Sequence, residues 1–180
     1  QNFTPSAIAI GGVTGYKKVD LCKNIEGKRT RIYYLLKGEV TLTEIYGNYR
    51  QAMEKAGFAF LAKGIDDKNN VSKEVGGATF LNVFYEKNPY PASKNINLLK
   101  GSSTSGGTCY LAGHLEKNGR SVYIVLTGKQ YMANEKVFLL DVIEETTMKV
   151  DLIKVNANEM QKELKANGKI ALYGIYFDFD

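Results

Sequence analysis

The sequence contains a single histidine, His114, and only two cysteines, Cys22 and Cys109. A structural zinc site takes four cysteine or histidine ligands, so this small set excludes one, and we predict no cofactor. A disulfide would require the two cysteines to face each other. The alternation along each strand places Cys22 outward and Cys109 inward. We therefore expect two separate thiols, with a disulfide as the alternative.

Long apolar runs are absent. A membrane-spanning helix needs about 18 to 20 consecutive apolar residues, whereas the longest apolar stretches, such as residues 137–140, have the length of a strand. The sequence also lacks an initiator methionine and a charged leader followed by an apolar run. We expect it to begin either at an engineered boundary or where a signal peptide was removed. With 180 residues, 44% of them hydrophobic, the chain can form a core.

Catalytic motifs are missing too. The glycine-rich stretch at residues 100–108 lacks the lysine that a phosphate-binding loop places after its second glycine, and Ser105 stands where a nucleophile elbow needs glycine. Ser-His-acid or Cys-His catalysis would have to use His114, the only imidazole available as a base, and this residue falls mid-strand. We predict that the protein is not an enzyme. A hydrolase that combines His114 with Ser103 or Ser105 is the least favoured alternative.

The net charge is +5, and the basic residues form one sequence cluster. Its members lie on two short strands that read as one hairpin: Lys17, Lys18, Lys28, Arg29 and Arg31. Water-facing strand positions are normally polar, which explains the cluster without a ligand. Nucleic acid is not expected, because the aromatic residues show no base-stacking pattern. The alternative is that this basic 17–31 hairpin, or a pocket near residues 64–106, binds a polyanion or a small ligand.

The first half of the chain predicts strands at 16–25 and 28–36, joined by a turn at Glu26-Gly27. Thr41 and Glu44 form a capping box that begins a helix, which Gly57 ends. The helix has one apolar stripe, made of Ile45, Tyr49, Ala52, Met53 and Ala56. A strand follows at residues 58–63.

The second half begins with a long insertion, residues 64–106, in which 71–87 predicts a helix despite the Gly76-Gly77 pair. Asn118-Gly119 then predicts a tight hairpin between two apolar runs. A third strand at 136–145 and a helix at 156–168 follow. Because hairpins dominate this order, we predict an α+β fold: a mainly antiparallel sheet of hairpins with two or three helices packed on it.

The final stretch, residues 169–180, alternates apolar and polar side chains as a half-buried strand does. Its end, Gly-Ile-Tyr-Phe-Asp-Phe-Asp at residues 174–180, resembles the first strand of OmpA-type peptidoglycan-binding domains. We therefore expect an α+β domain of unknown function at 1–168 and, at 169–180, the first strand of an OmpA-like domain that continues beyond Asp180. Phe177 and Phe179 would then pack on this domain's edge or on a neighbouring molecule.

This resemblance implies a Gram-negative, periplasmic protein associated with the cell envelope. The element order at residues 7–168 is similar to that of uncharacterised domains that precede such modules. We expect a non-enzymatic interaction or scaffold domain whose partner is an envelope protein, or a cell-wall component bound through the OmpA-like domain. The residues that grip peptidoglycan in that family lie downstream of the first strand, so no site residue is transferred to this chain.

Overall fold

The computed structural model describes residues 3–15, 18–66, 72–87, 99 and 106–146. These belong to one of the two units into which the chain divides, Gln1–Thr146. The predicted helix at 156–168 and the predicted strand at 169–180, with Phe177 and Phe179, fall in the other unit and lie outside the described residues.

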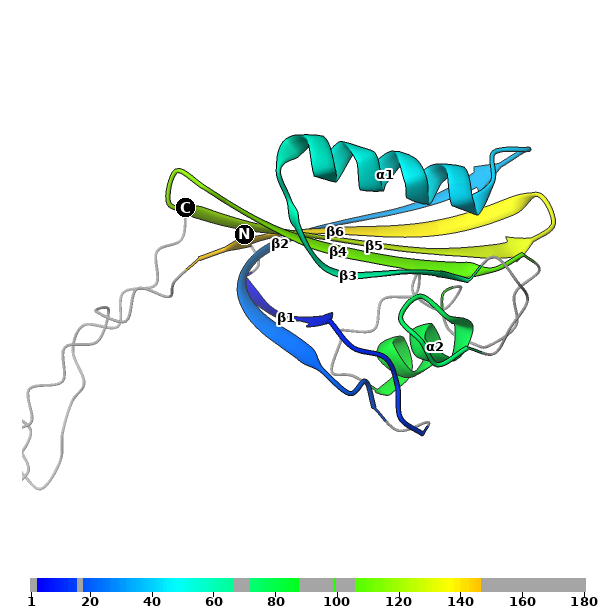
Figure 1. Ribbon diagram of the computed structural model, residues 1–180, viewed down its shortest axis with the longest axis horizontal. Coiled ribbons are helices and arrows are strands. Elements are labelled where there is room, and N and C mark those ends of the chain that lie inside the picture. The colour runs from blue at the N-terminus through cyan, green and yellow to red at the C-terminus, as the bar shows by residue number, and fades with distance from the viewer. Residues whose placement is uncertain (1–2, 16–17, 67–71, 88–98, 100–105, 147–180) are drawn as a thin grey trace, which may run out of the picture. The chain divides into compact units, whose positions relative to one another are not determined.

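One antiparallel sheet organises the described unit (Figure 1). In space its strands follow the order β1-β2-β6-β5-β4-β3. Two helices, α1 and α2, lie on opposite faces of the sheet (Figure 1). The elements are β1 Phe3–Ala9, β2 Cys22–Lys37, α1 Leu42–Ala56, β3 Ala59–Asp66, α2 Ala78–Lys87, β4 Thr108–Lys117, β5 Arg120–Met132 and β6 Glu135–Glu145. The predicted α+β class with a mainly antiparallel sheet is confirmed.

The predicted turn at Glu26-Gly27 is wrong, because β2 runs straight through it. Both residues pair with β1 on one side, and Gly27 also pairs with Glu145 on the other. A side chain at Gly27 would collide with the backbone carbonyl of Glu144. The glycine therefore permits a close approach of neighbouring strands. Close backbone approach is a common reason for glycine inside a strand, as a turn is a common reason for glycine between strands. The sequence reading also missed β1, which forms the hairpin with β2.

Helix α1 begins and ends as predicted. The Thr41 side chain accepts a hydrogen bond from the backbone N–H of Glu44, whose carboxylate binds back to Thr41, and Gly57 ends the helix in the left-handed conformation. The apolar stripe needs a correction. Ala52 and Ala56 are exposed, and the buried face of the helix is instead formed by Leu42, Ile45, Tyr46 and Met53.

The hairpin at Asn118-Gly119 is confirmed. Asn118 has φ 55° and Gly119 has φ 71°, as the two central residues of a type I′ turn require. This turn joins β4 to β5, and β6 pairs with β5 as the third strand. The predicted helix at 71–87 is shorter than expected, because α2 starts at Ala78, just after the Gly76-Gly77 pair.

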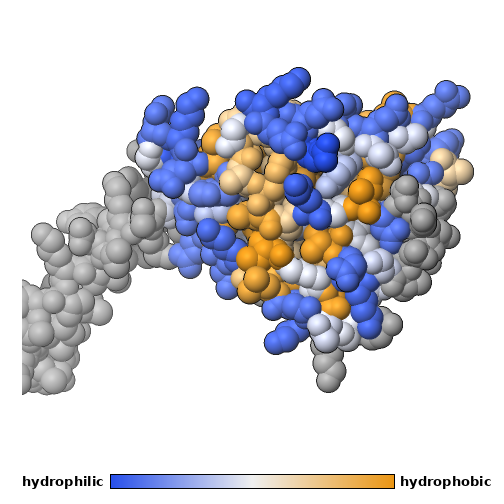
Figure 2. All heavy atoms as spheres, viewed as in Figure 1, coloured by the Kyte–Doolittle hydropathy of each residue, from blue (hydrophilic) through white to orange (hydrophobic). Residues whose placement is uncertain are grey.

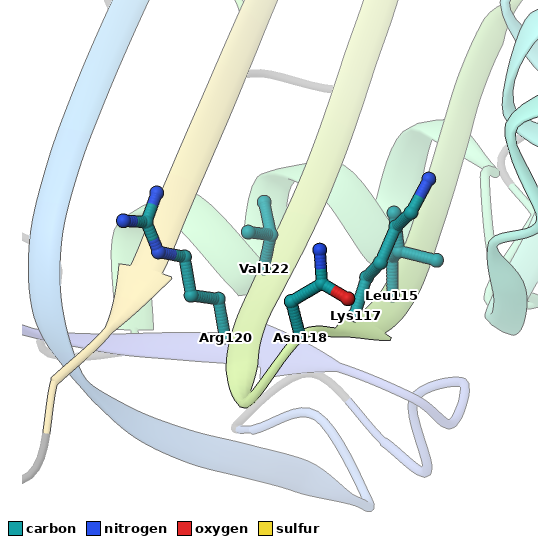
Figure 3. Close-up of a pocket in the computed structure, with 5 residues that line it drawn as sticks. All are labelled: Leu115, Lys117, Asn118, Arg120 and Val122. Carbon is teal, nitrogen blue, oxygen red and sulfur yellow. The ribbon is translucent and has the colours of Figure 1, made fainter.

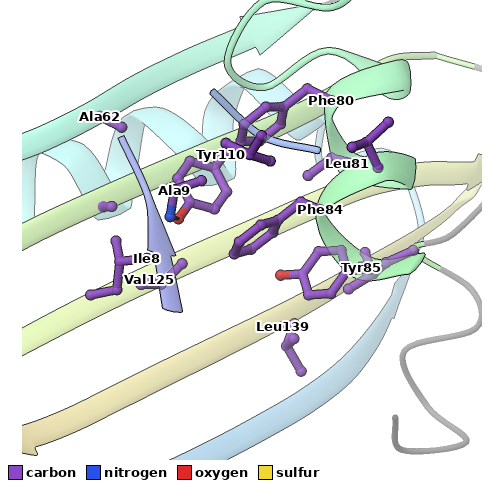
Figure 4. Close-up of a cluster of buried hydrophobic side chains, with 14 of the residues drawn as sticks. Ile8, Ala9, Ala62, Phe80, Leu81, Phe84, Tyr85, Tyr110, Val125 and Leu139 are labelled. Atoms are coloured by element: carbon purple, nitrogen blue, oxygen red, sulfur yellow. Dashed lines mark hydrogen bonds between the residues drawn. The ribbon is translucent and has the colours of Figure 1, made fainter. Parts of the chain in front are cut away.

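Each face of the sheet has its own core. Between α1 and the sheet lie Met53, Leu111, Leu126 and Phe138. On the other face, the rings of Phe80 and Phe84 from α2 meet Tyr110 of β4 edge-on (Figure 4). The hydroxyl of Tyr110 accepts a hydrogen bond of 3.0 Å from the backbone N–H of Ala9, which ties β1 to β4 across this core.

Candidate functional site

Part of the sheet face that carries α1 is left uncovered. Cross-strand pairing places its residues on one face: Ile32 lies opposite Leu140, Val142 opposite Ile124, and Val122 opposite Leu115. Leu126 of β5 lies opposite Leu140 on the same face, and it is buried under α1. We name the six aliphatic residues the open sheet face: Ile32, Leu115, Val122, Ile124, Leu140 and Val142.

The open sheet face lies at the side of α1. The helix packs chiefly on β3, β4 and β5. It reaches β2 at Tyr34, whose hydroxyl lies 2.8 Å from that of Tyr49. One turn further along the helix, Met53 lies over Gly113 of β4, where a side chain on the glycine would collide with it. Within the open sheet face, Leu140 and Ile124 pack against the margin of the α1 core, whereas Ile32, Leu115, Val122 and Val142 lie outside that core among the described residues.

The burial of these residues agrees with this geometry. Ile32 is 47% exposed, and the other five are partly buried, whereas Leu111, Leu126 and Phe138 beneath α1 are fully buried. Six aliphatic side chains in adjoining rows make a contiguous apolar surface. Such surfaces on a water-soluble domain mark binding sites more often than isolated apolar residues do.

A hollow lies at the hairpin end of the open sheet face. It has a volume of about 520 Å³ and is lined by Leu115, Lys117, Asn118, Arg120 and Val122. Figure 3 shows these side chains on the same side of the β4–β5 hairpin, with the two aliphatic residues behind the polar turn. The hollow therefore has an apolar floor and a basic rim.

The charges at this rim are unevenly paired. Lys28 and Glu144, which lie on the same face, are 3.8 Å apart and about half exposed. Within the described part of the chain, no carboxylate lies within ion-pair distance of Lys117 or Arg120. These two cations flank the Asn118-Gly119 turn, where Lys117 on β4 lies opposite Arg120 on β5.

A second apolar area is visible in Figure 2, beneath the end of α1 where β3 begins. Phe58 and Phe60, at the start of β3, are partly buried and pack against the α1 core. The Lys63 ammonium lies 5.0 Å from the centre of the Phe60 ring. We interpret this area as the margin of the core, since its aromatic residues already have partners.

The basic cluster of the sequence is not a hairpin surface. Lys18 lies in the connection between β1 and β2, Lys28, Arg29 and Arg31 lie on β2, and Lys17 is outside the described residues. Arg31 is turned inward. Its Nε and one terminal nitrogen each donate to a carboxylate oxygen of Asp141 at 2.6 Å, and the Asp141 side chain is only 3% exposed.

His114 lies on β4, at the sheet position that was predicted. Its Nε2 is 2.7 Å from the hydroxyl of Ser121, and its ring stacks on Tyr123 at 4.4 Å. Ser103 and Ser105 are outside the described residues. A catalytic triad requires a third group that orients the histidine through its other nitrogen, and no described residue is hydrogen-bonded there. We interpret the pair as a structural polar contact between β4 and β5.

The neighbours of His114 add further polar contacts. The hydroxyl of Tyr123 donates to Glu145 at 3.2 Å, and the Lys23 ammonium lies 5.0 Å above the Tyr123 ring. The hydrogen bond to Tyr123 raises the pKa of Lys23. Sequence reasoning missed Ser121 and Tyr123, although the register of the Asn118-Gly119 hairpin places both beside His114. Lys23 could not be found in this way, because it lies on β2, which no short turn joins to β5.

The two cysteines are free thiols. Cys109 is buried beneath α1, as predicted, and burial raises the pKa of its thiol to about 12. Cys22 was predicted to face outward, but it is half-buried and packs against the core on the other face of the sheet. Burial raises its pKa as well.

Comparisons of the chain with protein families, curated proteins and solved structures give no match. Within the described ranges, no three or more histidine, cysteine, aspartate or glutamate side chains form a group that could hold a metal ion. None of the described helices has the length and apolar character to span a membrane. The pocket predicted near residues 64–106 stays a prediction, since most of that segment lies outside the described residues.

Proposed function

We propose that this chain is a non-enzymatic interaction domain that binds an envelope protein through the open sheet face. The observation that carries the proposal is a contiguous row of partly exposed aliphatic side chains beside α1, with two cations at one end. Burial of apolar area drives most protein association, and each Å² removed from water contributes about 25 cal/mol before the costs of association.

The location in the cell envelope is also a proposal, and it depends on the sequence. The resemblance of residues 174–180 to the first OmpA-type strand supports a periplasmic domain attached to a peptidoglycan-binding module in the full-length protein. The interaction domain would then act as a scaffold, because the module anchors it to the cell wall while the open sheet face holds the partner.

Binding of a polyanion or a small ligand on residues 17–31 has weaker support. Lys28 is close to Glu144, and Arg31 is engaged by Asp141. A polyanion would have to compete with these carboxylates for the same cations. We therefore keep this function as the alternative, to be tested by binding to lipopolysaccharide at low and high salt.

The main test is site-specific photo-crosslinking in the full-length protein, expressed in its own cells. A benzoylphenylalanine in place of Ile32 should form one saturable adduct with a partner, and excess unlabelled protein should compete for it. The substitution Val142→Asp in the same chain should abolish the adduct, because it places a charge in the apolar surface.

Leu35 provides a matched control for this experiment. It lies on the same strand, is 42% exposed and faces the opposite side of the sheet. A crosslinker at position 35 should give no saturable adduct. Equal adducts from positions 32 and 35, or adducts that Val142→Asp leaves intact, would contradict the proposal.

The cell-wall part of the proposal has its own test. Intact peptidoglycan should pull down the full-length protein from solution and leave the 180-residue chain in the supernatant. Sedimentation of both proteins to the same extent would show that the cell wall is bound within residues 1–180, contrary to the attachment proposed here.

A further inference from the structure

We propose that the occupant of the open sheet face is a single amphipathic α-helix of a partner protein, with acidic side chains that reach Lys117 and Arg120. This inference rests on the proposed function and specifies its partner.

The occupant cannot be an added β-strand. β5 pairs with β4 and β6, and β6 pairs with β5 and β2, so both central strands have neighbours on each side. Their backbone groups are used within the sheet, and recognition on this face must come from side chains. An added strand would need a free edge.

The space fits one helix. The open sheet face extends over four adjacent strands, β2, β6, β5 and β4. The residues form a diagonal strip from Ile32 on β2 to Leu115 on β4, and each of its three rows joins two neighbouring strands. A strip of this shape suits one rod about 10 to 12 Å across, which is the diameter of a helix with its side chains. A helix laid beside α1 would complete a layer of two helices on this face.

A flat membrane fits less well. Because α1 is a helix layer that stands about 10 Å above the sheet, a bilayer that rested on α1 would not reach the aliphatic floor beside it. The floor lies in a recess with α1 on one side and the hairpin cations at one end. A rod-shaped apolar ligand can enter this recess, and a helix that presents leucine or isoleucine at i, i+4 and i+7 has that shape.

Charge complementarity specifies the rest of the partner. Lys117 and Arg120 have no carboxylate within ion-pair distance in the described residues, and Glu144 is closest to Lys28. Glutamate or aspartate in the last turn of a docked helix would meet these cations. The negative end of the helix dipole would add to the attraction if the helix carboxyl end lies at the hollow.

The test uses two fluorescein-labelled peptides of 18 residues with the same leucine stripe. Glutamate flanks the stripe in one peptide and lysine in the other. With the 180-residue chain, fluorescence anisotropy should show that the acidic peptide binds about five-fold or more tightly than the basic one, as expected for two partly exposed ion pairs. The double variant Lys117→Glu/Arg120→Glu should reverse this preference.

Three controls separate the possible outcomes. Lys18→Glu changes the charge by the same amount as either single reversal at Lys117 or Arg120, but at an exposed lysine away from the hollow. It should leave the preference for the acidic peptide unchanged. Ile32→Asp should weaken both peptides together, since it disrupts the shared apolar floor. Urea unfolding of each variant should show an unchanged midpoint. If Lys117→Glu/Arg120→Glu is unstable, the double variant Lys117→Gln/Arg120→Gln takes its place, and it should bind both peptides equally.

The results distinguish the partner from the function. If both peptides bind equally and Ile32→Asp abolishes their binding, the proposal of an acidic partner is refuted. The open sheet face would still be a binding surface. Binding of neither peptide would overturn the helical partner, while the crosslinks from position 32 decide the function independently. If the chain binds phosphatidylglycerol vesicles and Ile32→Asp abolishes this binding, the occupant of the open sheet face is a membrane surface. This result would also overturn the inference of a helical partner.

Discussion

The buried pair of Arg31 and Asp141 provides a sharp test of how this sheet is stabilised. The two side chains make two parallel hydrogen bonds of 2.6 Å between β2 and β6, and both are largely removed from water, at 16% and 3% exposure. The perturbation is Arg31→Met, which keeps the aliphatic stem and removes the guanidinium. Asp141 then remains as a buried carboxylate without its cation.

The expected cost follows from this burial. Breaking a buried ion pair by removing one partner destabilises a protein by about 3 to 5 kcal/mol, because the remaining charge is not compensated. The exposed pair of Lys28 and Glu144 lies on the same two strands, at 3.8 Å and about half exposed. Removing that lysine should cost at most about 1 kcal/mol. A double variant, Arg31→Met/Asp141→Leu, should recover most of the loss.

The assay is equilibrium unfolding in urea, followed by circular dichroism, for the wild type, Arg31→Met, Lys28→Met and the double variant. The free energy of unfolding should decrease strongly in Arg31→Met alone. A loss of less than about 1 kcal/mol in that variant would refute the reasoning. So would equal losses in Arg31→Met and Lys28→Met, since burial would then not determine the contribution of an ion pair here.

Four further outcomes are expected. Thr41→Ala removes the capping box of α1 and should lower the free energy of unfolding by about 0.5 to 2 kcal/mol, measured in urea. Tyr85→Phe removes a hydrogen bond of 2.6 Å and leaves the buried hydroxyl of Thr127 without that partner, at a cost of about 1 to 3 kcal/mol. In native protein at pH 8, Ellman's reagent should modify Cys22 well before Cys109, and both in denaturant. Because the folded pKa of Cys109 is raised from 9.0 to about 12, the stability due to its neutral thiol is fully present below pH 9. It should be lost as the pH rises through that interval, and Cys109→Ala should lack this contribution.

Local sequence signals predicted the local structure well. The capping box of Thr41 and Glu44 located the start of α1, and Asn118-Gly119 located the β4–β5 turn. Each signal is a hydrogen bond or a backbone conformation between near neighbours in the chain, so the residue types suffice to identify it. Gly27 was misread because its role depends on Glu144, more than a hundred residues away.

Half of the candidate site could also have been found from the sequence. A two-residue turn at Asn118-Gly119 fixes the register of its hairpin, so that Lys117 pairs with Arg120 and Leu115 with Val122. The hollow follows from this pairing alone. Ile32 could not have been added to it, because the register between β2 and β6 is set by long-range packing, and no turn joins these two strands.

The same long-range register links the stability of the sheet to its proposed binding surface. Arg31 and Asp141 face one side of the sheet, and their strand neighbours Ile32 and Leu140 face the other. A slip of one residue between strands exchanges the two faces. It would also leave Asp141 buried without its bidentate partner, so the ion pair penalises the slipped arrangement more than it stabilises the native one. The pair thereby holds Ile32 and Leu140 together on the open sheet face, although neither charged residue would touch a ligand bound there.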